Sequence, residues 1–175
     1  MFDEFLKYTN SDVVMEEIKD DNQFLKKMFG KSFFNGMYRL FETTDIEKWN
    51  DIVEKTFGQY KGKINVFGYD WLGRIFAVNK QTNTILLFEP GAGTVLNIPV
   101  GIEEFHNVEI VEYNEDCLAS RAFREWMEKN NYVLKNNECA GYKVPLFLNG
   151  DDVIENMEVS DMEVYWEIMM PLVNL

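Results

Sequence analysis

The chain has 175 residues and a mass of 20.6 kDa, which fits one domain and is long enough to bury a core. Hydrophobic residues make up 46% of the chain and aromatic residues 15%, and this composition excludes a disordered tail. The 17 Lys and Arg against 30 Asp and Glu give a net charge of −13. That charge argues against direct nucleic-acid binding, because cationic side chains supply most of the affinity for phosphates, and it favours a basic partner.

The N-terminus and the cysteines indicate where the protein works. Asp3 and Glu4 stand where a secretory signal would carry positive charge, and no apolar run approaches the roughly 20 residues that a membrane helix needs. Cys117 and Cys139 are too far apart for a CxxC motif or a zinc pair, so we expect two buried, reduced thiols. We therefore expect a cytoplasmic protein with no membrane segment.

The first third of the chain is predicted to be mostly helical. Apolar periodicity marks three helices, which span residues 2–8, 12–29 and 45–57. The second is interrupted near residues 20–22. The third is the clearest, because Thr44 and Glu47 have the spacing of a capping box and Gly58 stands where a helix commonly ends. Its apolar face is formed by Ile46, Trp49, Ile52, Val53 and Phe57.

The middle of the chain is predicted to be a β-meander. Short apolar runs rich in Val, Ile and Phe recur at residues 63–69, 74–79, 85–89 and 94–100. The connections are short, so neighbouring strands are antiparallel. The last connection contains a Gly-x-Gly motif, which we interpret as a hairpin turn. A phosphate-binding loop would be followed by a helix, and here a strand follows.

Helical periodicity returns after the meander. We expect a short helix over residues 102–106 and a strong one over residues 116–129. A further apolar run at residues 142–148 is predicted to be a strand that joins the sheet. Residues 161–172 fit either a strand or a helix, and a cap at residues 160–161 favours the helix.

These elements predict an α+β fold in a single domain over residues 1–175. A mainly antiparallel sheet would combine the meander at residues 63–100 with the strand at residues 142–148, and the helices would pack on one face of it. Residues 1–60 would form a mostly helical N-terminal part, and residues 61–175 the remainder.

Residues with catalytic or metal-binding chemistry are scarce. The one histidine, His106, is interpreted as a helix-surface or capping residue, because a metal site would want more nitrogen or sulfur ligands. Asp70 and Glu89 could act as general acid and base, but nothing in the sequence brings them together. The acids at residues 149–161 lack the spacing of a calcium loop. We therefore predict no catalytic residue, no metal site, no cofactor and no enzymatic activity.

The stretch FGYDWLGR at residues 67–74 has two interpretations. Its aromatic side chains can close the edge of the core, with the oppositely charged side chains paired across a hairpin. Alternatively, the stretch is an exposed loop that binds a protein partner, as Tyr and Trp do at interfaces. The candidate partner-binding residues are Tyr69, Asp70, Trp71 and Arg74.

Negative charge is concentrated at the C-terminal end. Residues 136–175 contain one base and eight acids, a net charge of −7. Such a segment is either a solvated face or a docking surface for a basic protein, which long-range attraction would bring in quickly. The candidate docking residues are Asp151, Asp152, Glu155, Glu158 and Asp161. Nearby apolar side chains could anchor the partner or belong to the core, and these are Met157, Met162, Tyr165 and Trp166.

Four stretches resemble a known family. They are FGYDWLGRIFAVN, LLFEPGAGTVLNIP, EEFHNVEIVEY and GYKVPLFLNGDDVIENMEVSDMEVYWEI, which together span residues 67–168, and GKSFFNGMYRLF adds a vaguer match near the N-terminus. They are similar to the C-terminal domain of the type VI secretion immunity family that protects bacteria against a DNase effector, and to the uncharacterised bacterial proteins that share this domain. The resemblance implies a cytosolic protein that binds and neutralises a basic toxin, and it implies no enzyme.

Two other classes of function remain open. One is a small-molecule-binding or enzymatic domain, with a pocket between the meander and the helix at residues 116–129. The other is a scaffold subunit of a larger assembly, which would expose a large apolar patch or form a stable oligomer.

Overall fold

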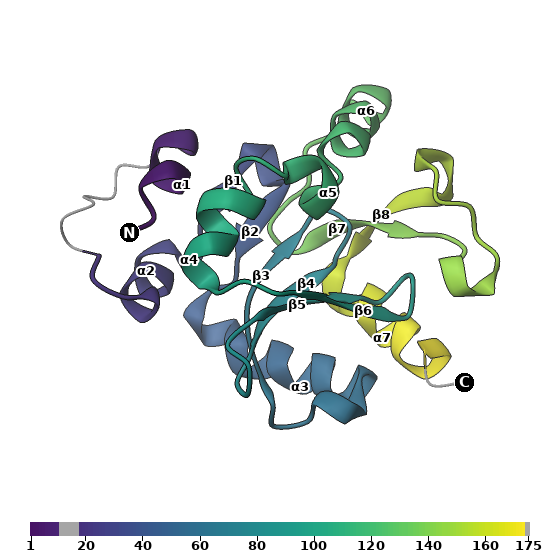
Figure 1. Cartoon of the computed structure of the whole chain (residues 1–175). Helices are drawn as coiled ribbons and strands as arrows, with labels where there is room; N and C mark the ends of the chain where they lie inside the picture. The colour runs from purple at the N-terminus through teal and green to yellow at the C-terminus, as the bar shows by residue number, and fades with distance from the viewer. Residues whose placement is uncertain (11–17, 174–175) are drawn as a thin grey trace.

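The computed structural model describes residues 1–10 and 18–173. Within them, six strands form an antiparallel sheet in which each strand pairs with its neighbours in sequence (Figure 1). The strands are β1 (Ser32–Phe33), β2 (Tyr38–Leu40), β3 (Ile64–Asp70), β4 (Ile75–Asn79), β5 (Ile85–Glu89) and β6 (Thr94–Ile98). The α+β fold and the meander are confirmed. β1 and β2 extend the sheet into the part predicted to be mostly helical.

Helices cover both faces of the sheet, so the prediction of one covered face is wrong (Figure 1). The first face carries α1 (Asp3–Tyr8), α2 (Asp21–Met28), α4 (Ile102–Glu104), α5 (Asn114–Leu118) and α6 (Ser120–Asn130). The second face carries α3 (Ile46–Thr56) and α7 (Met162–Val173). Strand side chains alternate between the two cores, as Phe76 and Ala77 do, and β4 and β5 are therefore nearly continuous apolar runs.

The helices on the second face lie where the sequence predicts them. The apolar face of α3 is buried, as at Trp49 and Val53, but no side-chain hydrogen bond caps its described N-terminus, so the capping box is not formed. α7 is capped as predicted, because Oδ1 of Asp161 accepts hydrogen bonds from the backbone N–H groups of Glu163 and Val164 at 3.0 and 3.1 Å. Among the described residues, no helix combines the length and the apolar character needed to cross a bilayer.

The helices on the first face differ from prediction at their ends. α1 coincides with the predicted helix, whereas α2 starts after Asp20, whose side chain accepts from Gln23 N at 2.8 Å. Residues 12–17 of the second predicted helix lie outside the described residues, and residues 18–20 are not helical. The predicted helix at 116–129 is two helices, because Ala119 adopts a positive φ of 51° between α5 and α6. The carboxylate of Glu115 accepts from the N–H of Arg121 at 2.8 Å and so caps the new helix.

The strand predicted at residues 142–148 is wrong. The strand is β7 (Glu138–Tyr142), and it pairs with β8 (Met157–Asp161) in a separate two-stranded sheet instead of joining the large one. The ladder ends after β7, because the side chain of Asn156 binds the N–H and the carbonyl of Val144 in place of a partner strand. Pro145 cannot donate a backbone hydrogen bond, and a 3-10 helix follows at Leu146–Leu148. The β7–β8 hairpin therefore stands beside the main sheet and carries a long loop (Figure 1).

The only histidine is buried, so its interpretation as a surface or capping residue is wrong. α4 continues as a π-helix over Phe105–Glu109, and the side chain of His106 points from it into the core on the first face of the sheet. Its Nδ1 donates to the carbonyl of Ile102 at 2.7 Å, so Nε2 accepts from the hydroxyl of Tyr38 at 2.9 Å. Aromatic rings surround it, with Phe24 centred at 4.6 Å. Burial lowers the pKa of His106 to about 3, against an ordinary value of 6.5.

His106 is expected to make stability fall with acidification. The pKa of His106 is lower in the folded state than in the unfolded state. Between about pH 6.5 and pH 3 the imidazole is therefore protonated in the unfolded state and neutral in the folded state. This contribution is complete above pH 6.5, and its loss below that value steepens the fall of the unfolding free energy by about 1.4 kcal/mol per pH unit. Urea titrations at several pH values should show a shallower slope for His106→Gln than for the wild type. Equal slopes would show that His106 does not carry this dependence.

Candidate partner-binding surface

The aromatic stretch at the end of β3 and in the turn that follows it is buried, so the exposed-loop interpretation is wrong. Tyr69, Asp70 and Trp71 are 5%, 0% and 0% exposed. The indole of Trp71 donates to the carbonyl of Leu118 at 2.8 Å, and the hydroxyl of Tyr69 donates to the carbonyl of Asn136. These side chains tie the sheet to α5 and to the segment that leads into β7. The other interpretation, aromatic side chains that close the edge of the core, is confirmed.

Arg74 joins the β3–β4 turn to the rest of the molecule, and its predicted pairing with Asp70 is confirmed. Its guanidinium contacts Oδ2 of Asp70 at 2.6 Å, donates to Oε1 of Glu89 at 3.0 Å, and donates to the carbonyl of Cys117 at 2.8 Å. Asp70 also accepts the N–H groups of Leu72 and Arg74, both at 3.0 Å. Burial raises the pKa of Asp70, and its bonds to Arg74 oppose that rise.

The structure therefore brings Asp70 and Glu89 to the same guanidinium, which the sequence interpretation missed. The predicted hairpin contained the signal. In the β4–β5 register Ile75 faces Phe88, so the residues just outside that pair, Arg74 and Glu89, come together at the end of the ladder. Both carboxylates bind Arg74, which also binds the carbonyl of Cys117, so this side chain links β3, β5 and α5.

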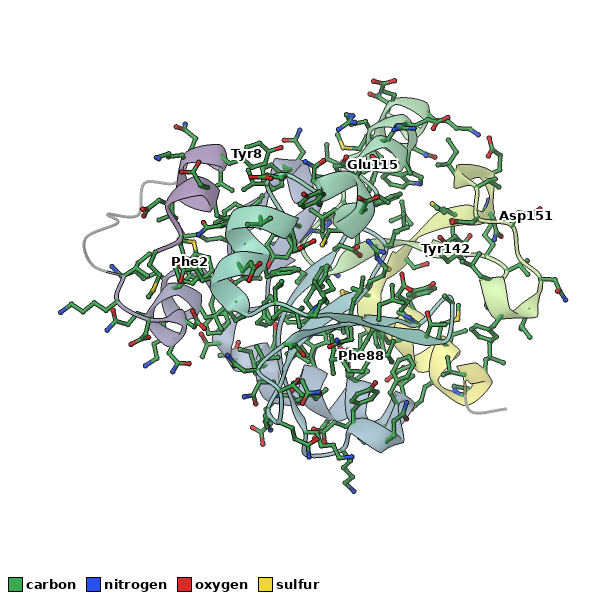
Figure 2. All side chains as sticks on the ribbon, viewed as in Figure 1. Phe2, Tyr8, Phe88, Glu115, Tyr142 and Asp151 are labelled. Carbon is green, nitrogen blue, oxygen red and sulfur yellow. The ribbon has the colours of Figure 1, made fainter. Side chains whose placement is uncertain are left out.

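The five acidic residues predicted to bind a partner are, by contrast, all exposed to solvent. We call the side chains of Asp151, Asp152, Glu155, Glu158 and Asp161 the acidic surface. They lie in the loop between β7 and β8 and along β8, and Asp151 is at the outer edge of the molecule, beyond Tyr142 (Figure 2). The two halves of the predicted binding set thus separate into a buried ion-pair cluster and an exposed surface.

The loop that carries the acidic surface is built around Asn156. Its amide accepts from the N–H of Val144 at 3.0 Å and donates to the carbonyls of Val144 and Asp151 at 2.8 and 2.9 Å. Gly150 packs so closely on the backbone of Val144 that a Cβ at position 150 would overlap the carbonyl oxygen of Val144. The loop is therefore shaped by its own polar contacts, which places its carboxylates in defined positions.

The five carboxylates differ in how they are engaged. Asp161 caps α7, and Asp152 accepts from the hydroxyl of Tyr142 at 2.6 Å. Glu155 pairs with Lys129, whose ammonium lowers the pKa of Glu155. No ion pair or side-chain hydrogen bond from the described residues reaches the carboxylates of Asp151 and Glu158. These last two are therefore the most available to an incoming cation.

Exposed apolar side chains gather in the same part of the chain. The structure exposes eleven large hydrophobic residues among those it describes, and six of them lie between residues 144 and 168. They are Val144, Leu148, Val153, Val159, Val164 and Ile168. The anchors considered from the sequence are instead buried, and these are Met157, Met162, Tyr165 and Trp166. The acidic segment thus exposes apolar side chains, but different ones from those that the sequence suggested.

A cleft of about 590 Å³ lies between the end of β4 and β5, α6 and the β7–β8 hairpin. It occupies nearly the place considered for a pocket, between the meander and the helix at residues 116–129. One guanidinium and five carboxylates line it, namely Arg74, Glu89, Glu115, Glu125, Asp152 and Glu155. The cleft is therefore negatively charged, and it is continuous with the acidic surface because Asp152 and Glu155 belong to both.

The two cysteines are buried and form no disulfide, and burial raises the pKa of the Cys117 thiol to about 12.

The crystal structure of Atu4351 from Agrobacterium tumefaciens is similar to this chain, with a TM-score of 0.60 over 97% of this chain and 88% of that chain. The identity is 17%, so the likeness shows the fold alone. No family model and no curated protein matches the chain.

Proposed function

We propose that the chain is an immunity-type binding protein, which neutralises a basic protein toxin by docking its acidic surface on it. The observation that carries this proposal is the coincidence, between residues 144 and 168, of exposed carboxylates with exposed apolar side chains. Carboxylates attract a basic surface over a distance, and apolar contacts hold it after encounter. The family resemblance of residues 67–168 supports the same role.

A nuclease is the target that this chemistry suits best. A DNA-cleaving protein needs a basic surface to bind phosphates, and an acidic protein can cover that surface by presenting carboxylates in their place. Neutralisation of this kind needs no catalytic group on the inhibitor. It works in the cell that makes the toxin, so we propose a cytoplasmic location.

Charge reversal of the two most available carboxylates is expected to weaken binding to the basic partner by about tenfold or more, with most of the loss in the association rate. The variant is Asp151→Lys/Glu158→Lys, whose side chains have no described ion pair to lose. A matched control, Glu47→Lys/Asp51→Lys, makes the same change of charge at two exposed positions of α3. Both variants should melt like the wild type, because exposed substitutions alter stability little.

The measurement begins with capture of partners from the source cell's lysate at low salt, followed by release in a salt step. The released fraction is assayed for cleavage of plasmid DNA with and without added protein. We expect a basic nuclease that the wild type and the α3 control inhibit and the loop variant inhibits poorly. Equal inhibition by all three proteins would contradict docking through the acidic surface, and a released nuclease that none of them inhibits would contradict the proposed function.

The cleft supports a second candidate function, the binding of a small cationic molecule. Five carboxylates against one guanidinium, which is itself shared between Asp70 and Glu89, suit a positively charged ligand. Thermal stabilisation by spermidine that is lost in Glu125→Gln and kept in Glu128→Gln would favour this function, because binding to the folded state alone raises stability.

A further inference from the structure

One face of α7 has an apolar stripe that nothing in the described structure covers. Val164 and Ile168 are 50% and 55% exposed, and Pro171 is exposed one turn further on. Their spacing of four and then three residues places them on one side of the helix. We call these three side chains the α7 stripe. Such a stripe normally faces a core, and here it faces outward.

The core side of the same helix is fully used. Tyr165, Trp166 and Met169 pack into the second core, and the indole of Trp166 donates to the carbonyl of Gly73 at 2.8 Å. This packing fixes the rotation of α7 about its own axis. The α7 stripe cannot turn inward without removing these side chains from the core, so its exposure is imposed by the fold.

Carboxylates flank the α7 stripe. Glu163 and Glu167 stand beside it, one turn apart, and Glu163 pairs with Lys48 of α3 at 2.8 Å. Asp161 stands at the start of the helix, where the acidic surface ends. The α7 stripe is therefore an apolar strip with an acidic border, and it continues the acidic surface along the chain.

We propose that the α7 stripe is the apolar half of the docking surface and takes a basic amphipathic segment, one that presents apolar side chains flanked by Lys or Arg. This inference rests on the proposed function and adds the chemistry of the partner's contacting segment. Apolar side chains of the segment pack on Val164 and Ile168, and its cations face Glu163 and Glu167. The contact resembles that of two helices packed along apolar stripes, with charges at the sides.

Charge decides against the other occupants. A second copy packed through the same stripe by twofold symmetry would bring Glu163 and Glu167 of both copies together, in a chain that already carries a net charge of −13. An anionic lipid surface is repelled by the same carboxylates. A basic segment satisfies both the apolar strip and its border.

The probe is an 18-residue synthetic helix with Leu on one face and Lys on the other, capped at both ends. Its control has the same composition in a scrambled order, so the two peptides differ only in whether their Leu side chains share a face. Binding is measured by titration calorimetry and located by amide chemical shifts. We expect the amphipathic peptide to shift α7 amides and to bind about tenfold or more tightly than the scrambled one.

The decisive variant is Val164→Gln/Ile168→Gln. Gln favours a helix more than Val or Ile does, and both sites are half exposed, so the fold should persist. Affinity for the amphipathic peptide should fall about tenfold or more, towards that of the scrambled peptide. A matched control, Leu96→Gln/Val133→Gln, removes two equally exposed apolar side chains elsewhere and should leave affinity unchanged.

Three results would overturn the inference. The scrambled peptide could bind as tightly as the amphipathic one, or the stripe variant could keep full affinity. Sedimentation could also show a wild-type dimer that the stripe variant abolishes, which would assign the stripe to a second copy. None of these three results changes the outcome expected in the toxin assay, because the loss of inhibition in Asp151→Lys/Glu158→Lys depends on the acidic surface alone. Failure of the α7 stripe is thus distinguishable from failure of the proposed function.

Discussion

Replacement of Arg74 by Met is expected to destabilise the fold by about 3 to 5 kcal/mol, the cost of removing one partner from a buried ion pair. The side chains of Arg74 and Asp70 are 12% and 0% exposed, so solvent does not compensate the carboxylate that is left behind. The same change releases Glu89 and the carbonyl of Cys117, and thus loosens β5 and α5 together. Unfolding in urea, followed by circular dichroism, gives the change in free energy.

A double variant separates the charge from the shape of the site. Asp70→Leu/Arg74→Met removes both partners, and it should recover much of the stability lost in Arg74→Met, because no buried charge remains unpaired. The surface control is Arg124→Met on α6, which is exposed and should change stability by less than about 0.5 kcal/mol. A loss below about 1 kcal/mol in Arg74→Met would show that Asp70 finds another partner or becomes neutral at little cost.

Truncation of Trp71 to Ala is expected to cost about 3 to 5 kcal/mol, the range for removing a large buried aromatic side chain. Trp71 is fully buried between the sheet and α6, with Phe123 and Trp126 centred 5.3 and 6.2 Å from its ring. Its indole hydrogen bond to the carbonyl of Leu118 is lost as well. Urea unfolding gives the cost.

The same variant separates a core role from a partner-binding role. If Trp71 serves the core, Trp71→Ala should lower the melting temperature and leave the partner affinity of the folded fraction unchanged. Tyr113→Ala is the control, because Tyr113 is 49% exposed and its loss should alter stability little. A folded Trp71→Ala variant with wild-type stability and weakened binding would restore the exposed-loop interpretation.

Local pattern was enough to find most elements. Strands β3 to β6 follow from short apolar runs at hairpin spacing, and α3 follows from its period of apolar residues, because both signals depend only on neighbours in sequence. The cap of α7 at Asp161 is also local. The wrong strand at residues 142–148 has the same origin, since an apolar run predicts a strand whether or not Pro145 ends it.

Local sequence pattern did not predict which distant elements pack against each other. The hydrophobic period does not say which core a strand residue enters, so two-sided coverage was missed although β4 and β5 read as continuous apolar runs. The burial of His106 depends on a π-helix and on aromatic rings from the distant α1 and α2. The near-uniform apolar composition of α7 likewise hides which side chains face out.

The sequence by itself determined the α+β class, the meander and the concentration of negative charge near the C-terminus, because composition and short-range periodicity express these directly. Only the tertiary structure decided that Asp70 and Trp71 are buried while Asp151 and Glu158 are exposed. A charged or aromatic residue carries no local mark of its depth. Depth is fixed when distant elements pack together, as β7 and α6 do around the turn after β3.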